Sequence, residues 1–239
     1  MSNSFFQLKQ FTVHQDQCAM KVCTDACLFG AWVADKIKGN ESIKNVLDIG
    51  TGTGLLSLML AQKHDATITA VEMNSNAAKQ ATDNFNNTPW NVRLNVVQSN
   101  ILDFESDKKY DCIISNPPFF EADLKSDNQS KNAAKHDTTL TLGELMLQIK
   151  RLLKEDGVGC VLIPFHRTSY LEDLIKDNGF FINDKMLVKQ SVDHGYFRTM
   201  IIFSGKPAAI ISEELYIHDD QRQYSEGFIT LLKDYYLKL

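Results

Sequence analysis

The chain has 239 residues, of which 44% are hydrophobic, and its formal net charge at pH 7 is −5. A chain of this length can bury a sizeable core as one α/β domain. The negative charge argues against a broad basic face that grips nucleic acid indiscriminately, although it leaves an RNA substrate open. We expect a cytoplasmic protein that does not enter a membrane, because the sequence shows neither a secretion signal nor a run of about 18 apolar residues.

The five cysteines form no Cys-x-x-Cys pair. A zinc site built from Cys18, Cys23 and Cys27 is one possibility, but an odd number of cysteines in a cytoplasmic protein favours reduced thiols. We therefore expect no bound metal.

The first forty residues are predicted to form a short strand or hairpin over residues 6–13 and an amphipathic helix over residues 25–38. Thr24 is the expected N-cap of that helix. A helix N-terminus suits a carboxylate ligand, while a plainly capped helix without a ligand is the alternative interpretation.

A buried strand over residues 46–50 is followed by a glycine-rich turn with Gly50, Gly52 and Gly54, and then by a helix over residues 55–62. Strand, glycine turn and helix form a nucleotide-binding unit, so a dinucleotide dehydrogenase is the first rival. That fingerprint requires its third glycine at position 55, where this chain has Leu55. The pattern favours the methyltransferase variant of the turn.

Polar side chains follow the next two predicted strands. The strand over residues 67–71 ends at Glu72, whose carboxylate could accept both hydroxyls of a ribose; a surface acid is the alternative. A helix is predicted over residues 75–86. The strand over residues 93–97 leads to Asn100, whose side chain could bond an adenine amino group.

The strand over residues 110–115 ends in Asn116-Pro117-Pro118-Phe119. The Asn116 side-chain oxygen and the Pro117 carbonyl can each accept one N–H bond, and so hold a poorly nucleophilic planar nitrogen in a reactive geometry. The two prolines remove backbone donors and fix φ, and Phe119 offers a flat face on which an extruded base can stack. The alternative interpretation is an ordinary turn, because Asn-Pro and Pro-Pro are common in loops.

The polar stretch over residues 121–139 is expected to be a substrate loop, in which Lys135 and His136 could meet phosphate. The remaining predicted elements are helices over residues 142–153 and 170–176, strands over residues 158–164 and 214–218, an antiparallel pair over residues 180–188 and 196–203, and a terminal helix over residues 226–236. They predict an α/β fold with the seven-stranded Rossmann-like sheet of class I methyltransferases, mostly parallel with one antiparallel strand and flanked by helices. We expect a single domain over residues 1–239, with residues 1–40 as an extension on the substrate side and residues 207–239 as an appended strand and helix.

The chain resembles the bacterial valine-tRNA adenine-37 N6-methyltransferases. The resemblance is carried by residues 48–54 and 116–119, which resemble class I amino methyltransferases in general, and by residues 6–13, 18–22 and 24–25, which resemble the N-terminal signature of this family; residues 224–237 are similar to its usual ending. It implies transfer of a methyl group from S-adenosylmethionine to N6 of adenosine 37 in the anticodon loop of a valine tRNA. We separately expect a monomer. By resemblance, the target adenine is taken by Asn116, Pro117, Pro118 and Phe119, and the cofactor is held by Lys21, Thr24, Asp48, Gly50, Thr51, Gly52, Gly54, Glu72, Met73, Asn100, Ile101 and Asn116. The chain departs from the family pattern at Cys23, Cys27 and Lys135.

Three other functions stay open. A protein glutamine N5-methyltransferase of release factors would use the same Asn-Pro-Pro turn to grip a carboxamide, but no long helical N-terminal domain is predicted here. A DNA adenine methyltransferase would need a recognition domain, for which 239 residues leave little room. A catalytically silent RNA-binding protein on the same fold would have no need of intact glycine, Glu72 and Asn116 motifs.

Overall fold

The computed structural model describes residues 3–18, 20–118 and 140–239. Its strands are β1 (Phe5–Gln7), β2 (Thr12–His14), β3 (Asn45–Ile49), β4 (Thr67–Glu72), β5 (Leu94–Gln98), β6 (Tyr110–Ser115), β7 (Leu153–Pro164), β8 (Phe181–Ser191), β9 (Tyr196–Ser204) and β10 (Ile211–His218). Its α-helices are α1 (Thr24–Ile37), α2 (Leu55–Lys63), α3 (Ser75–Asn86), α5 (Leu142–Leu152), α6 (Thr168–Asp177) and α7 (Glu226–Leu232), with 3-10 turns η1 (Asn91–Arg93) and η3 (Phe165–Arg167).

Eight of the described strands form one sheet in the order β10-β8-β9-β7-β6-β3-β4-β5. Only β9 runs antiparallel to its neighbours, and β10 adds an eighth strand parallel to β8. The predicted fold class is therefore confirmed. The sheet is parallel through its centre because every crossover there contains a helix or long connection, as parallel pairing requires.

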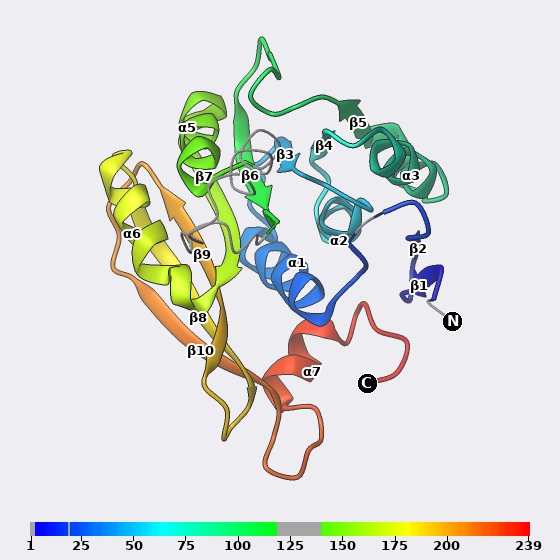
Figure 1. Ribbon diagram of the computed structural model, residues 1–239, viewed down its shortest axis with the longest axis vertical. Helices are drawn as coiled ribbons and strands as arrows, with labels where there is room; N and C mark the ends of the chain where they lie inside the picture. The colour runs from blue at the N-terminus through cyan, green and yellow to red at the C-terminus, as the bar shows by residue number, and fades with distance from the viewer. Residues whose placement is uncertain (1–2, 19, 119–139) are drawn as a thin grey trace, which may run out of the picture.

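Helices cover both faces of this sheet, and each face has its own buried core (Figure 1). Side chains of α1, α2 and α7 pack on one face, and side chains of α5 and α6 pack on the other. The central strand β6 is buried along its whole length, which explains its apolar run Cys112-Ile113-Ile114. Figure 1 shows α7 beside α1, so the C-terminal helix adds to the core that the N-terminal helix builds.

The N-terminal segment forms the predicted hairpin, in which β1 and β2 pair as a separate two-stranded sheet. The prediction that Thr24 caps α1 is wrong: the helix begins at Thr24, and Cys23 is the N-cap without a side-chain hydrogen bond. Asp25 explains the difference, because its carboxylate accepts from the Ala26 amide at 3.1 Å and supplies the negative charge of the first turn.

Two other boundaries differ from prediction by four or five residues. The terminal helix ends at Leu232, because the amides of Tyr235 and Tyr236 both turn back to the Leu232 carbonyl. That turn buries Tyr235, whose hydroxyl donates to the Met59 carbonyl of α2 at 3.0 Å. Strand β7 starts five residues earlier than predicted, directly after α5.

Candidate cofactor and substrate site

Four of the residues predicted to act lie at one edge of the sheet, where parallel strands end. Gly50 follows β3, Glu72 ends β4, Asn100 comes two residues after β5, and Asn116 follows β6. The register pairs Ile49 with both Val71 and Ser115. Neighbouring strands lie about 4.8 Å apart, so these four residues lie along the edge that usually holds the ligand in an open α/β sheet.

The glycine-rich turn has a backbone that other residues rarely adopt. Gly50, Gly52 and Gly54 have φ angles of 72°, 56° and 85°. A Cβ at Gly54 would also lie 2.5 Å from Phe85 Cε1 of α3. A left-handed φ and this close approach both require glycine. The turn therefore places three residues without a Cβ at the start of α2, where a ligand can approach the backbone closely.

Glu72 is held by two backbone amides. Its Oε2 accepts from the Gly52 amide at 2.9 Å, and its Oε1 accepts from the Asn74 amide at 2.9 Å. Asn74 is in turn the N-cap of α3, with its side chain accepting from Asn76 and Ala77. Each carboxylate oxygen has a further lone pair, so Glu72 can still accept a pair of neighbouring hydroxyls.

Asp48 is fully buried in β3, beneath the glycine turn. Its Oδ2 accepts from the hydroxyls of Thr51 at 2.6 Å and Ser57 at 2.7 Å, while its Oδ1 has no hydrogen-bond partner among the described residues. Burial raises the pKa of this carboxyl to about 6. A buried acceptor without a donor is uncommon in folded proteins and indicates a place for a donor from a ligand or water.

Asn116 presents a second unsatisfied oxygen at the same edge. Its buried Oδ1 has no partner in the described part of the chain. Ser115 fixes the strand end beneath it, because its hydroxyl donates to the Ile49 carbonyl at 2.9 Å. Pro117 is buried and Pro118 is exposed, and neither carries an N–H. Pro117 and Pro118 therefore offer carbonyl acceptors but no backbone donor. The predicted stacking residue Phe119 lies outside the described residues, as do Lys135 and His136.

The adenine side of the predicted site contains one polar and two apolar residues. Asn100 Oδ1 accepts from the Leu102 amide at 3.1 Å, so the side chain is already oriented by its own loop. Ile101 is buried, whereas Met73 exposes 51% of its surface next to Glu72. Met73 follows β4 and Ile101 follows the neighbouring strand β5, so the two could form an apolar slot for a flat ring.

The N-terminal segment reaches the same region. Burial raises the pKa of the Cys18 thiol to about 11, and the nearby Glu72 carboxylate adds to this shift. Lys21 is exposed, and its ammonium donates to the Asn3 carbonyl at 3.1 Å. At the start of α1, the Asp25 carboxylate pairs with Arg198 of β9 at 2.5 Å. The helix N-terminus is thus fixed to the sheet near the strand ends.

Sequence reasoning missed the residues of α3 that hold this segment. Asn84 is fully buried; its amide donates to the carbonyls of His14 and Thr53, and its oxygen accepts from the His14 amide at 2.9 Å. Gln80 accepts from the Gln17 amide at 2.9 Å. The available signal was two amides on the otherwise apolar face that the alanines of α3 present. Asn84 thereby joins the N-terminal hairpin to the glycine turn.

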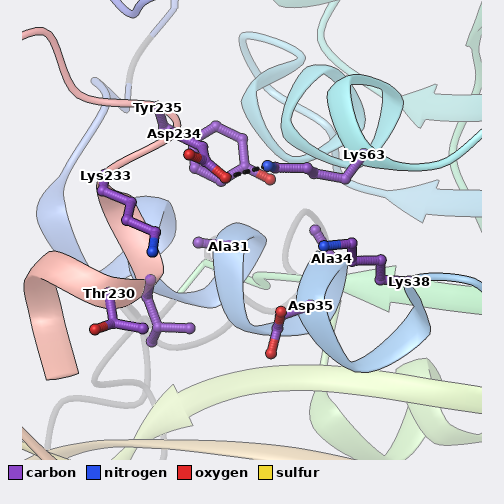
Figure 2. A pocket seen from close by; sticks show the side chains of 10 residues that line it. Ala31, Ala34, Asp35, Lys38, Lys63, Thr230, Lys233, Asp234 and Tyr235 are labelled. Carbon is purple, nitrogen blue, oxygen red and sulfur yellow. Dashed lines mark hydrogen bonds and ion pairs between the residues drawn. The ribbon is translucent and has the colours of Figure 1, made fainter.

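A separate cavity of about 270 Å³ lies between α1, α2 and α7. Figure 2 shows Lys63 pointing toward Asp234, with the Tyr235 ring beside it. Lys38 and Lys63 lie just after and at the C-termini of α1 and α2, so this cavity is at the opposite edge of the sheet from Asn116. Its lining contains none of the predicted site residues, and its contacts join the C-terminal tail to the core.

The described residues were examined for metal-binding groups and for membrane-spanning helices. No group of three or more His, Cys, Asp or Glu side chains there could hold a metal ion, and all five cysteines are free thiols. No helix there is both long and apolar enough to cross a lipid bilayer.

The methyltransferase small domain family matches residues 31–161, which include the glycine turn, Glu72 and Asn116. A Cytophaga hutchinsonii protein named tRNA1(Val) (adenine(37)-N6)-methyltransferase is 42% identical to this chain over the full length of both. Proteins with the same name from Dyadobacter fermentans and Pseudoalteromonas translucida are 42% and 38% identical, over 99% of this chain and 98% and 100% of theirs. The chain belongs to the tRNA1(Val) (adenine(37)-N6)-methyltransferase family.

Solved structures support the fold of this family member. A predicted O-methyltransferase of Agrobacterium tumefaciens has a TM-score of 0.66 at 14% identity, with 88% of this chain and 96% of that chain covered. A glycopeptide N-methyltransferase complexed with S-adenosyl-L-methionine has a TM-score of 0.52 at 10% identity, with 74% and 88% covered. At these identities the likeness establishes the class I methyltransferase fold.

Proposed function

We propose that this chain transfers a methyl group from S-adenosylmethionine to N6 of adenosine 37 in a valine tRNA. The observation that carries the proposal is the unsatisfied, buried Oδ1 of Asn116 at the strand edge next to the glycine turn. An amino group with two N–H donors is the ligand that such an acceptor and the following Pro117 carbonyl would hold. Family membership then selects adenosine of tRNA over other amino substrates.

The cofactor side of the proposal rests on groups that fit S-adenosylmethionine. When bound, that cofactor supplies an electrophilic methyl group on a positively charged sulfur. Glu72 would accept the ribose hydroxyls, and the unpartnered Asp48 Oδ1 would accept from the amino group directly or through water. The turn containing Gly50, Thr51, Gly52 and Gly54, whose four amides donate to groups of the protein, would let the ligand approach its glycine backbone closely. The α1 N-terminus at Thr24 would favour the carboxylate of the ligand.

The remaining cofactor contacts follow from position. Asn100 would bond the cofactor adenine, whose ring would lie between Ile101 and Met73. Lys21 would lie on the methionyl side, where it would have to leave the Asn3 carbonyl or share its ammonium with the ligand.

On the substrate side the residues would act mainly by orientation. Asn116 Oδ1 and the Pro117 carbonyl would each accept one N–H of the target amino group, which turns the nitrogen lone pair toward the methyl group. Orientation of this kind can contribute on the order of 7–11 kcal/mol of barrier reduction at best. No strong base is required, because the nitrogen loses its proton after the attack. Stacking of the base on Phe119 stays a prediction.

An anticodon-loop adenosine suits this site because it is already single-stranded. Extruding a base from a duplex costs a few kcal/mol, and least where the base is unpaired. The monomeric state, the cytoplasmic location, and the roles of residues 1–40 as a substrate-side extension and of residues 207–239 as an appendage also stay predictions.

The decisive experiment offers the protein labelled S-adenosylmethionine with unmodified total tRNA, and with release factor protein in a parallel reaction. We expect label in N6-methyladenosine of one valine tRNA, identified by nucleoside analysis. Label in the release factor alone would replace the proposal with the protein glutamine N5-methyltransferase. Cofactor binding without transfer to either substrate would favour the silent RNA-binding protein.

A further inference from the structure

A cluster of aromatic and basic side chains follows β7, on the strand next to β6. Phe165 and Tyr170 expose 36% and 49% of their surface. The Arg167 guanidinium lies 5.1 Å from the centre of the Tyr170 ring. Isolated exposed aromatic residues are common on protein surfaces, but here two exposed rings and an arginine lie within six residues, and the arginine lies over one of the rings.

The cluster lies at the edge of the sheet that carries Asn116. Ser115 of β6 pairs with Val161 of the parallel strand β7. Counted from this pair, Asn116 lies one residue further along its strand and Phe165 lies four residues further along the chain. With strands about 4.8 Å apart and about 3.3 Å per residue, the two backbones are separated by about 11 Å. A nucleotide next to a base held at Asn116 would therefore reach Phe165.

The surrounding contacts hold Phe165 in place. Its ring packs on Tyr196 of β9 with centroids 5.0 Å apart. The Tyr196 hydroxyl donates to Glu214, and the Lys189 ammonium lies 4.5 Å from the Tyr196 ring centre. The Thr168 hydroxyl donates to the Phe165 carbonyl at 2.6 Å, which fixes the turn. A ring that is already oriented loses little conformational freedom when a base stacks on it.

We propose that Phe165, Arg167 and Tyr170 form a stacking surface for single-stranded RNA nucleotides that flank the methylated base. Aromatic faces and a guanidinium are the groups on which unpaired bases stack, and the cation also attracts the phosphate backbone. The proposal rests on the proposed function for the identity of the RNA. It assigns the contacts that a chain with net charge −5 would need beside its pocket.

The test measures the affinity of an unmodified valine tRNA anticodon stem-loop by fluorescence anisotropy. Phe165→Ala should raise the dissociation constant about tenfold, Phe165→Leu should behave alike, and Phe165→Trp should stay near wild type because it restores a stacking face. The matched control is Phe181→Ala, since Phe181 is 45% exposed at the opposite edge of the sheet. S-adenosylmethionine affinity should be unchanged in all four variants, which also shows that each is folded.

Equal RNA affinity of Phe165→Ala and Phe181→Ala would overturn the proposal, as would equal losses for Phe165→Trp and Phe165→Ala. If Phe165→Ala lost binding to the release factor but kept its affinity for RNA, the proposal would also be overturned, in favour of a protein-docking surface. Nucleoside analysis of the wild-type reaction separates the two proposals. Methylated RNA with an unaffected Phe165→Ala variant removes only the stacking surface, whereas weakened RNA binding without any N6-methyladenosine in the wild-type reaction removes only the proposed reaction.

Discussion

The Gly52 backbone amide donates a hydrogen bond of 2.9 Å to Glu72 Oε2, across 20 residues of sequence. The same carboxylate accepts from the Asn74 amide at the start of α3. One side chain therefore joins the glycine turn after β3 to the turn after β4. The acceptor proposed for the ribose is fixed before any ligand arrives, which reduces the entropy lost on binding.

Glu72→Gln is expected to weaken S-adenosylmethionine binding about 10–100-fold, because an amide has one acceptor oxygen where the carboxylate has two charged ones. Its NH2 group would also face either the Gly52 or the Asn74 donor. Isothermal titration calorimetry measures the change. Glu155→Gln, at an exposed position near the start of β7, is the control and should bind as the wild type does. Equal affinities of the two variants would contradict the role given to Glu72.

Asn116→Ala should leave S-adenosylmethionine affinity nearly unchanged and reduce methyl transfer about 10²–10³-fold, as loss of one positioned polar group does in other active sites. Transfer should fall while cofactor affinity stays the same because the unpartnered oxygen of Asn116 is proposed to orient the substrate and not the cofactor. Single-turnover transfer at saturating cofactor and RNA checks this. Undiminished transfer would refute the role of Asn116. Asn178→Ala, at the C-cap of α6, is a control for general effects of losing an asparagine.

Asp48 is expected to make stability depend on pH in a particular direction. Its folded-state pKa of about 6 lies above the ordinary value of 3.8, so the folded protein binds this proton more tightly than the unfolded chain does. The free energy of unfolding should therefore fall as pH rises from about 4 to about 6, by on the order of 3 kcal/mol from this group. Asp48→Asn should be more stable than wild type at about pH 8 and should lose that advantage at about pH 4.

Urea denaturation of both proteins across this pH range measures the difference, and all other titrating groups cancel in it. A constant stability difference between wild type and Asp48→Asn would contradict the raised pKa. The gain in stability should be accompanied by weaker S-adenosylmethionine binding, because the charge that is costly to bury is the one proposed to meet the amino group.

Gly54→Ala should lower the free energy of unfolding by about 2–5 kcal/mol, which combines a left-handed φ with a Cβ placed against Phe85. The matched control is Gly143→Ala in α5, where the nearest atom to a new Cβ, Thr141 Oγ1, is 4.0 Å away. That substitution should stabilise the protein by about 0.5–1 kcal/mol. Chemical denaturation of both variants checks the pair, and equal effects would show that neither φ nor Phe85 constrains position 54.

Asn84→Asp should destabilise the protein by about 2–5 kcal/mol, because an oxygen replaces the NH2 that bonds the His14 and Thr53 carbonyls. S-adenosylmethionine affinity should fall as well, since Thr53 belongs to the glycine turn. Asn178→Asp removes a donor to one helix carbonyl at a less buried position, and should cost less than about 1 kcal/mol. Normal cofactor affinity in Asn84→Asp would show that the turn holds its shape without the hairpin.

Much of the fold could be predicted because local signals agreed with tertiary needs. The helix over residues 75–86 and the strand over residues 110–115 occur with the predicted bounds. The start of α1 could not be predicted from Thr24, because Asp25 meets Arg198 from a distant strand and supplies the charge of the first turn. The end of α7 could not be predicted either, because burial of Tyr235 against Met59 turns the chain there.

The sequence by itself determined the order of the elements and the residue types at the strand ends, since the glycine spacing, Glu72 and the Asn-Pro-Pro turn are local features of the chain. Only the tertiary structure decided which polar atoms are satisfied. Contacts between distant segments leave the oxygens of Asp48 and Asn116 without partners and join Asn84 to the hairpin. They also place Phe165 at the edge of the sheet that carries Asn116. Burial and hydrogen bonding arise from the whole packed chain, and periodicity along one segment carries no record of them.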